Sequence, residues 1–224
     1  MSDTPVDYKA VGNVGIARFD DGKVNALSYR ALDALNSALD QAERDAEALV
    51  LVGRPGKFSA GFDLSVMRQG VQAATDMVKV GAELALRLYA FPCPVVAACS
   101  GHAIAMGSLL LLACDSRIGI TGDFKIGLNE VSIGMPLPVV GIELARDRLS
   151  PRHVTRAVLE AEIYSPEGAV EAGFLDRVIA PDALDAEALS EAQRLAGLDT
   201  PAHHATKKRM RQATIDRIRQ SLTE

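Results

Sequence analysis

The chain of 224 residues contains no tryptophan, and aromatic residues make up only 4% of it. Cysteine is also scarce, because Cys93, Cys99 and Cys114 are the only three, and they lie in apolar stretches without a CxxC pair. The four histidines show no spacing with cysteine or acidic residues that suits a metal ion. These absences argue against a disulfide framework and a zinc centre. We interpret the cysteines as buried thiols and expect no bound metal.

A surplus of positive charge is absent too, since the formal net charge is −5. This balance argues against general binding of nucleic acid or of anionic membranes. The first residues lack a basic region followed by an apolar run, so we predict no export signal and expect a cytoplasmic protein. The stretch from Leu88 to Cys114 carries no charged residue, yet Pro92, Pro94 and Gly101 interrupt it, which argues against a membrane-spanning helix. No GxSxG motif occurs, which argues against a hydrolase built on a nucleophile elbow.

The N-terminal residues predict a hairpin and a helix. Tyr8–Val11 and Val14–Phe19 read as two strands around the turn Gly12-Asn13. Apolar residues then recur at helical spacing, and this pattern predicts a helix from Ser28, a candidate N-cap, to about Arg44.

The middle of the chain alternates between buried strands and helices. The short apolar runs Ala48–Val52 and Pro94–Ala98 predict strands that are buried on both faces. A helix is expected over Val71–Tyr89, and another over Leu109–Ala113 before a strand at Arg117–Ile120. This order predicts an α/β fold with parallel strands.

Residues 136–224 read as a helical C-terminal portion, which follows a sheet-rich core over residues 1–135. Ser150-Pro151 and Ser165-Pro166 are both predicted helix starts, and Gly173 is a predicted helix stop. Val178-Ile179 predicts a short last strand. We expect one domain over residues 1–224, without a linker or repeats.

Three segments carry the candidate chemistry. Two glycine-bearing turns, Phe58–Leu64 and Gly101–Ser108, each follow a predicted buried strand, and Gly127–Glu130 ends on an isolated acid. Backbone N–H groups at strand ends are where α/β folds place ligands. Two such turns suit an oxyanion, and Glu130 would supply a base.

These segments resemble the crotonase family, the enoyl-CoA hydratases and isomerases, over nearly the whole chain. The resemblance rests on Phe58–Leu64, on Pro94–Asp115, on Gly127–Glu130 with Gly134, and on Ala169–Val178. It implies a crotonase-like fold of repeated β-β-α units with a helical C-terminal portion. It also implies an acyl-CoA thioester as substrate, no cofactor apart from the coenzyme A of that substrate, and a homotrimer or a dimer of trimers.

The resemblance implies that the backbone N–H groups of Ala60 and Met106 hold the thioester oxygen, and that Glu130 is the catalytic acid-base. Met106 departs from the family, which usually has glycine at this position. Asp63 is a better candidate for capping the next helix than for chemistry. The further residues that the resemblance places near the substrate are Asn25, Ala26, Leu27, Lys57, Ser59, Gly61, Phe62, Asp63, Leu64 and Leu109.

The reaction depends on a second acid. Hydratases of the family have two glutamates that position a water molecule, and the first of them corresponds to Leu109 here. The mitochondrial-type 3-enoyl-CoA isomerases keep only the second, so the resemblance favours movement of a 3-enoyl-CoA double bond to trans-2-enoyl-CoA in fatty-acid oxidation. An enoyl-CoA hydratase is the alternative, with Glu143 as a substitute acid. A catalytically weak acyl-CoA-binding protein is the alternative of another class.

A dense basic cluster lies near the C-terminus at Lys207, Lys208, Arg209 and Arg211. It reads either as the solvated face of an amphipathic helix or, from the resemblance, as a contact with a phosphate of coenzyme A.

Overall fold

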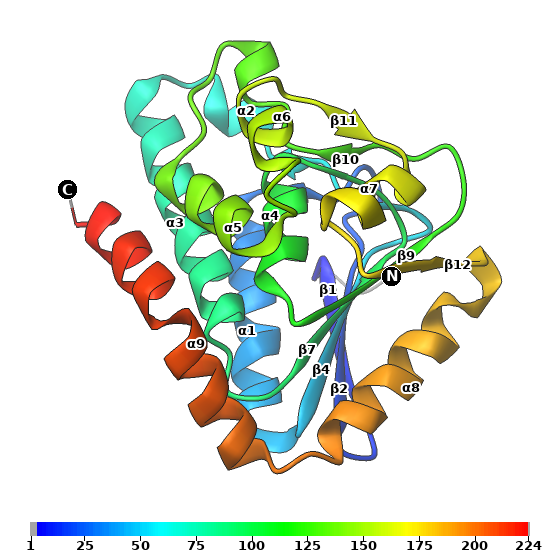
Figure 1. Ribbon diagram of the computed structural model, residues 1–224. Helices are drawn as coiled ribbons and strands as arrows, with labels where there is room; N and C mark the ends of the chain where they lie inside the picture. Colours follow the sequence, from blue (N-terminus) through cyan, green and yellow to red (C-terminus); the bar gives the residue numbers. More distant parts are fainter. Residues whose placement is uncertain (1–3, 224) are drawn as a thin grey trace.

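The computed structural model describes residues 4–223, and its largest element is a six-stranded sheet (Figure 1). All neighbouring strands are parallel except the first pair, which forms the antiparallel hairpin that the sequence predicts. The order in the sheet is β1 (Val6–Val11), β2 (Val14–Phe19), β4 (Ala48–Val52), β7 (Val95–Cys99), β9 (Ser116–Ile120) and β12 (Arg177–Ile179).

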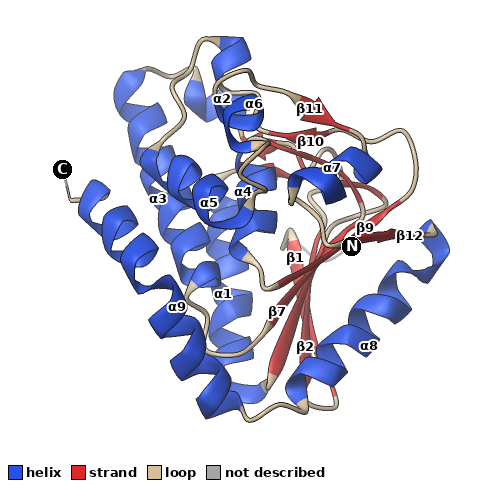
Figure 2. Cartoon of the chain, in the orientation of Figure 1, coloured by secondary structure: helices blue, strands red, loops and turns tan. Residues whose placement is uncertain are grey.

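Helices cover both faces of this sheet, which explains why β4 and β7 are apolar at every position (Figure 2). Leu49 and Leu51 point into the larger core beneath α1 (Tyr29–Asp45), α3 (Val71–Tyr89) and α4 (Met106–Ala113). Val50 and Val52 point the other way, into a smaller core that α8 (Leu184–Ala196) closes. Successive side chains thus enter two different cores.

Short strands form a second layer, which the sequence did not reveal. A four-stranded sheet has the order β11 (Ile163–Tyr164), β10 (Ile126–Gly127), β8 (Gly101–Ile104) and β5 (Gly56–Ser59). A separate pair joins β3 (Ala26–Leu27) to β6 (Gly61–Phe62). Strands of two to four residues are too short to show a period-two pattern, so tertiary pairing defines them.

The remaining helices surround these layers. They are α2 (Leu64–Met67), α5 (Val139–Arg148), α6 (Val154–Val158), α7 (Pro166–Ala172), α9 (Thr200–Ser221) and the 3₁₀ turns η1 (Val131–Ile133) and η2 (Pro181–Ala183). In Figure 1 the long C-terminal helix α9 lies beside α3 and α5, on the side of the molecule opposite α8. None of the helices within residues 4–223 is both long and apolar enough to cross a membrane.

The predicted helix ends were mostly confirmed. Ser28 caps α1, since its hydroxyl accepts the Ala31 N–H at 3.2 Å, and Ser165 caps α7. Gly173 ends α7 with φ +97°, a left-handed conformation that glycine adopts without strain. The predicted start at Ser150-Pro151 is wrong: this segment forms a turn, because the carbonyl of Ser150 accepts the His153 N–H at 2.8 Å, and α6 begins at Val154.

The C-terminal portion is helical, as predicted, but it also contributes strands to both sheets. β12 adds to the edge of the six-stranded sheet beside β9, and β11 pairs with β10 in the second layer. Residues beyond 135 are therefore structurally continuous with those before it.

Candidate active site

The second layer brings the three predicted segments to one edge. β5 and β10 pair with opposite edges of β8, and both pairings are parallel. The carboxyl ends of the three strands therefore point the same way. The two segments predicted as turns prove to contain strands of the second layer: Phe58–Leu64 begins in β5 and includes β6, while Gly101–Ser108 begins with β8 and ends in α4. The turns themselves are at Ala60 and Ala105, and Glu130 lies three residues beyond β10.

Close backbone contacts join the three segments. A Cβ atom on Gly107 would lie only 2.3 Å from the carbonyl oxygen of Ser59, so the start of α4 presses directly on the first turn. The Ala105 N–H donates to the carbonyl of Gly127 at 3.0 Å, and the Gly127 N–H donates to the Ser108 hydroxyl at 3.0 Å. The second turn is thus the centre of the site.

The structure corrects the donor predicted on the first turn. The Ala60 N–H is shared between the carbonyls of Val24 at 3.2 Å and Asn25 at 3.3 Å, so it is not free to bind a thioester oxygen. Successive N–H groups of a strand point in opposite directions. Since the Asp63 N–H donates to Leu27 in β3, the Phe62 N–H points away from β3.

Phe62 is therefore the candidate donor on this turn. The adjacent Gly61 faces the second turn, because a Cβ atom there would lie 3.4 Å from the Met106 nitrogen. Phe62 was expected to contact the substrate, but its backbone role was missed. No sequence signal could have shown it, because it depends on the pairing of two-residue strands.

Met106 is the first residue of α4, and its N–H remains the candidate donor on the second turn. Ala105 adopts φ +53°, which turns the chain sharply before the helix. The first N–H groups of a helix lack an intrahelical acceptor and lie at the positive end of its dipole. The Met106 side chain does not enter solvent, being 2% exposed, and its Cε lies close to Gly81 of α3, as does the ring of Phe62.

Glu130 is a buried acid with an unsatisfied oxygen. The residue is 8% exposed, and its Oε2 has no hydrogen-bond partner among the described residues. Burial raises the pKa of the Glu130 carboxyl, because the charged form loses its hydration. The neighbouring Asn129 also has a buried, unpartnered side-chain oxygen. A carboxyl group in this state is suited to proton transfer near neutral pH.

Neither the position of the hydratases' first glutamate nor the substitute acid Glu143 supplies a second acid. Leu109 is 1% exposed and lies one turn beyond Met106 in α4, so an apolar side chain occupies this position. Glu143 is buried in α5, and its carboxylate is paired with Arg217 of α9 and with Arg146 at 3.3 Å. Its oxygens are therefore engaged with arginine.

Asn25 and Leu27, which the resemblance places near the substrate, have buried side chains that support the first turn. Asn25 is fully buried, and its side-chain amide donates to the carbonyl of Phe19 at 2.7 Å, while its oxygen accepts the Asp21 N–H at 3.0 Å. Leu27 is likewise fully buried in the larger core. Both side chains are therefore used in packing the second layer, which leaves the backbone of this segment as the part that could lie near a substrate.

Ser59 and Gly61 are part of the same turn. The Ser59 hydroxyl donates to the carbonyl of Asn25 at 2.8 Å and accepts the Gly61 N–H at 3.2 Å. Gly61 has φ +86°, and little space surrounds it. Both residues shape the backbone that carries Phe62.

Asp63 caps α2, as expected, since its carboxylate accepts the Ser65 N–H at 2.8 Å. Asp63 and Ala26 also line a cavity of about 870 Å³, together with the charged side chains of Lys23, Arg30 and Arg54.

Lys57 lies opposite His102 in the β5–β8 pairing, and Leu64 is 55% exposed on α2. Burial, followed by the charge of Lys57, lowers the pKa of His102.

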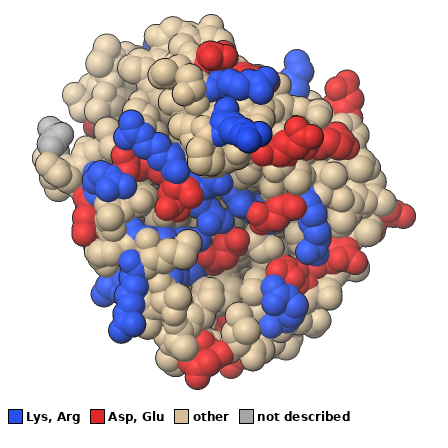
Figure 3. Space-filling view, viewed as in Figure 1, with Lys and Arg blue, Asp and Glu red and all other residues tan. Residues whose placement is uncertain are grey.

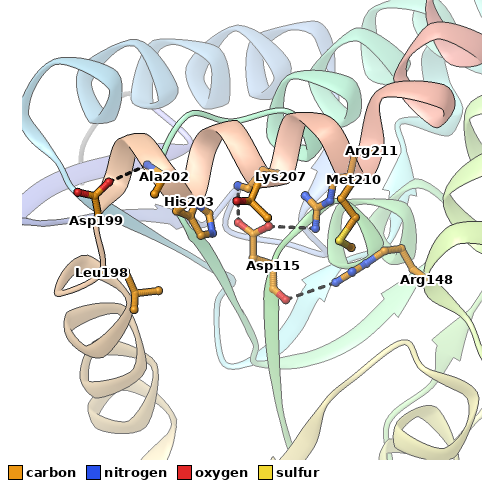
Figure 4. Close-up of a pocket in the computed structure, with 10 residues that line it drawn as sticks. Asp115, Arg148, Leu198, Asp199, Ala202, His203, Lys207, Met210 and Arg211 are labelled. Atoms are coloured by element: carbon orange, nitrogen blue, oxygen red, sulfur yellow. Dashed lines mark hydrogen bonds and ion pairs between the residues drawn. The ribbon is translucent and has the colours of Figure 1, made fainter.

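The C-terminal basic cluster is divided between the interior and the surface. Lys207 and Arg211 are 6% and 3% exposed, so neither belongs to a solvated face. Both are paired with Asp115, at 2.6 Å and 3.0 Å. Lys208 and Arg209 are exposed. Lys207 and Arg211 are thus buried cations beside Asp115 (Figure 4), and the reading of the cluster as a solvated face is wrong for these two residues.

The described residues contain no cluster of three histidine, cysteine or acidic side chains placed to hold a metal ion. The candidate chemistry therefore rests on the two backbone N–H groups and Glu130.

The fold and this site define a class of protein. The family model for enoyl-CoA hydratase/isomerase matches residues 9–224, so the chain belongs to the enoyl-CoA hydratase/isomerase family, with the crotonase-like fold that the sequence predicted.

Its relatives have been given both activities as names. The human mitochondrial enoyl-CoA delta isomerase 1 is 32% identical over 219 residues, which cover 95% of this chain and 72% of the human protein. A solved enoyl-CoA isomerase from Mycobacterium tuberculosis is 40% identical, with a TM-score of 0.94 over 99% of this chain and 97% of that one. A solved enoyl-CoA hydratase from Mycobacterium marinum is 41% identical, with a TM-score of 0.93 over 98% and 96%.

Proposed function

We propose that this enzyme is a 3-enoyl-CoA isomerase, which moves the double bond of a 3-enoyl-CoA to give trans-2-enoyl-CoA in fatty-acid oxidation. The observation that carries the proposal is a buried acid, Glu130, whose Oε2 has no partner among the described residues. It lies three residues beyond Gly127, whose carbonyl accepts the Ala105 N–H of the second turn. Leu109 cannot orient a water molecule, and Glu143 is held by arginine. One base is enough for an isomerisation, whereas hydration also requires an oriented water molecule.

The reaction begins when the Glu130 carboxylate takes a proton from C2 of the substrate. The electrons of the C2–H bond then form a dienolate, whose negative charge is concentrated on the thioester oxygen. The N–H groups of Phe62 and Met106 donate to this oxygen, with Phe62 in place of Ala60. Each donor of this kind contributes about 10²–10³ in rate. Glu130 then returns its proton to C4, which leaves the double bond between C2 and C3.

Burial matches Glu130 to both halves of this cycle. A base that must also return its proton works best when its pKa is close to the operating pH. The raised pKa of Glu130 moves it in that direction. Since Oε2 has no partner among the described residues, no protein donor competes with the substrate for it.

The coenzyme A portion is proposed to lie in the cavity of about 870 Å³ that Ala26 and Asp63 line. This cavity adjoins the first turn, because Ala26 pairs with Gly61 in the β3–β6 sheet. Lys23 lies on its wall and is proposed to provide positive charge for phosphate groups, whereas Arg54 on the same wall is paired with Asp20 at 3.2 Å.

Hydration is the second candidate, and the name of the Mycobacterium marinum relative favours it. It would require Glu143 to leave Arg217 and reach a water molecule beside Glu130. The two reactions consume different substrates, so a direct comparison separates them.

The test uses Glu130→Gln, which keeps the shape of the side chain but cannot accept the proton. The purified enzyme and variant are given 3-enoyl-CoA and 2-enoyl-CoA in parallel, and the products are separated by chromatography. Isomerisation is expected to fall by about 10²–10⁴ in Glu130→Gln, the usual contribution of a positioned base. Glu143→Gln, the matched change at the other buried acid, is expected to keep isomerase activity within a few-fold of wild type.

Undiminished isomerisation by Glu130→Gln would show that Glu130 is not the base. Hydration faster than isomerisation, and lost in Glu143→Gln, would establish the second candidate instead. Binding of acyl-CoA without turnover of either substrate would identify a binding protein.

A further inference from the structure

A glycine lies in the middle of the buried face of α3. Glycine in a helix interior is less favourable than alanine, because its backbone loses more freedom on folding. Gly81 is nevertheless buried there, between Met77 and Ala85, which lie one turn away on the same face. Acidic and basic side chains are interspersed over the surface that Figure 3 shows, whereas none of the buried residues over Val71–Tyr89 is charged. Gly81 therefore acts on its neighbours through packing.

The missing Cβ of Gly81 leaves a notch in α3 that the ring of Phe62 occupies. A Cβ atom on Gly81 would lie 2.3 Å from Cε1 and 2.4 Å from Cζ of Phe62. Both distances are far below van der Waals contact, so the ring could not keep its place beside a larger residue. Phe62 is half-buried, and this contact seats its ring on α3.

The strand that carries Phe62 is too short to fix its position by itself. β6 consists of Gly61 and Phe62, and it pairs only with the two residues of β3. An isolated pair of strands is marginally stable at best and needs packing against another element. The seat of the ring on Gly81 therefore contributes to the position of the Phe62 backbone, whose N–H is one of the two proposed donors to the thioester oxygen.

The side chain of the other proposed donor meets the same notch. Cε of Met106 would lie 3.6 Å from a Cβ atom on Gly81, which is an ordinary contact distance. The side chains of both donors thus converge on one turn of α3, although their backbones belong to β6 and α4. A methyl group added to Gly81 would displace the ring of Phe62 and leave the thioether of Met106 in place. The effect of such a change should therefore fall on the Phe62 donor.

We propose that Gly81 is a positioning residue of the oxyanion site, because its notch seats the ring of Phe62 and thereby orients the Phe62 N–H toward the thioester oxygen. This inference rests on the pair of donors in the proposed function. Preorganised donors act mainly on the charge that develops in the transition state. A displaced donor should therefore lower kcat far more than it changes KM.

The test observes the donors both with and without turnover. In the Glu130→Gln parent, the infrared stretch of the thioester carbonyl of trans-2-enoyl-CoA is compared between the free and the bound ligand, because hydrogen bonds lower this frequency. Gly81→Ala is expected to lose the part of the shift that the Phe62 N–H provides. With Glu130 intact, Gly81→Ala should lower kcat for the 3-enoyl-CoA by about 10- to 10³-fold, up to the cost of a lost donor, and keep KM within a few-fold. Gly168→Ala, a helical glycine with no atom nearer than 3.5 Å to its Cβ, should match the parent in both measurements.

Changes at Phe62 keep the test informative if Gly81→Ala does not fold. Phe62→Ala removes the ring but keeps the backbone N–H, so it should lose the same part of the carbonyl shift. Phe62→Leu combined with Gly81→Ala should recover shift and kcat relative to Gly81→Ala alone, because leucine lacks the ring atoms that the added methyl group would meet.

A carbonyl shift that both Gly81→Ala and Phe62→Ala leave intact would overturn this inference alone. A double variant no better than Gly81→Ala would also overturn it, since the clash with the ring would not be the cause. A bound carbonyl without any shift in the Glu130→Gln parent would overturn the proposed pair of donors together with the inference. The failure of the proposed function is thereby distinguished from the failure of the role of Gly81.

Discussion

The raised pKa of Glu130 comes from its burial, which the backbone around it determines. The residue is 8% exposed, and its Oε2 lacks a partner among the described residues. Most buried acids avoid this state by pairing with a cation, as Glu143 does with Arg217. The burial that raises the pKa of Glu130 is therefore a cost to stability, which the proposed proton transfer would explain.

The raised pKa predicts how stability depends on pH. The folded state favours the protonated form, so the contribution of Glu130 to stability is fully present below the unfolded pKa of about 4.3. It is lost as pH rises through the higher folded pKa. Glu130→Gln, which is neutral at every pH, should therefore be more stable than wild type at pH 7 and no more stable at pH 4. Urea unfolding at both values measures this, and a stabilisation that is equal at the two values would contradict it.

The start of α4 contacts the end of β5 at Gly107. This residue lies at the second position of α4, where the helix presses on the first turn through the carbonyl of Ser59. The contact holds the Met106 N–H beside Gly61. The proposed oxyanion site therefore depends on how one helix start packs on one strand end.

Gly107→Ala should damage both stability and activity. Its Cβ would lie 2.3 Å from a backbone oxygen, so either α4 or the first turn must shift. We expect a loss of about 1–3 kcal/mol in the free energy of unfolding, the usual cost of overpacking, and a lower kcat in the isomerase assay. Gly168→Ala is the matched control, because the nearest atom to its Cβ is 3.5 Å away. If Gly107→Ala is as stable and active as Gly168→Ala, the close packing does not hold the donors.

Over the whole molecule, Asp115 connects the sheet to the C-terminal helix. It follows α4 directly, accepts the Val95 N–H of β7 at 2.8 Å, and is paired with Lys207 and Arg211 of α9. Arg211 reaches further, donating to the carbonyl of Tyr89 at 2.7 Å. Burial lowers the pKa of Lys207, and the negative charge of Asp115 acts against this change by raising it.

Asp115→Asn should therefore destabilise the entire fold. It leaves Lys207 and Arg211 buried without a counter-charge, for which we expect a loss of about 3–5 kcal/mol in the free energy of unfolding. The control is Asp185→Asn, which breaks the exposed pair with Arg18 and should cost less than about 1 kcal/mol. Urea unfolding of both variants decides the matter, and equal losses would refute a special role for Asp115.

Much of this arrangement could be predicted from local sequence. The hairpin, the buried strands Ala48–Val52 and Val95–Cys99, the caps Ser28 and Ser165, and the helix stop Gly173 follow from apolar patterns and capping chemistry. The motifs around Gly61, Met106 and Glu130 were enough to indicate the family. The helix start predicted at Ser150-Pro151 was wrong, because the same residues suit a turn as well as a helix start.

The sequence by itself determined the parallel α/β core, because buried strands and amphipathic helices carry their own periodicity. Only the tertiary structure decided that the Ala60 N–H is bonded to the carbonyls of Val24 and Asn25, which makes Phe62 the candidate donor, since the direction of an N–H depends on which strand pairs with it. It also decided that Lys207 and Arg211 are buried while Arg209 is exposed. Charge can be read along a chain, but burial and pairing arise only when distant segments meet.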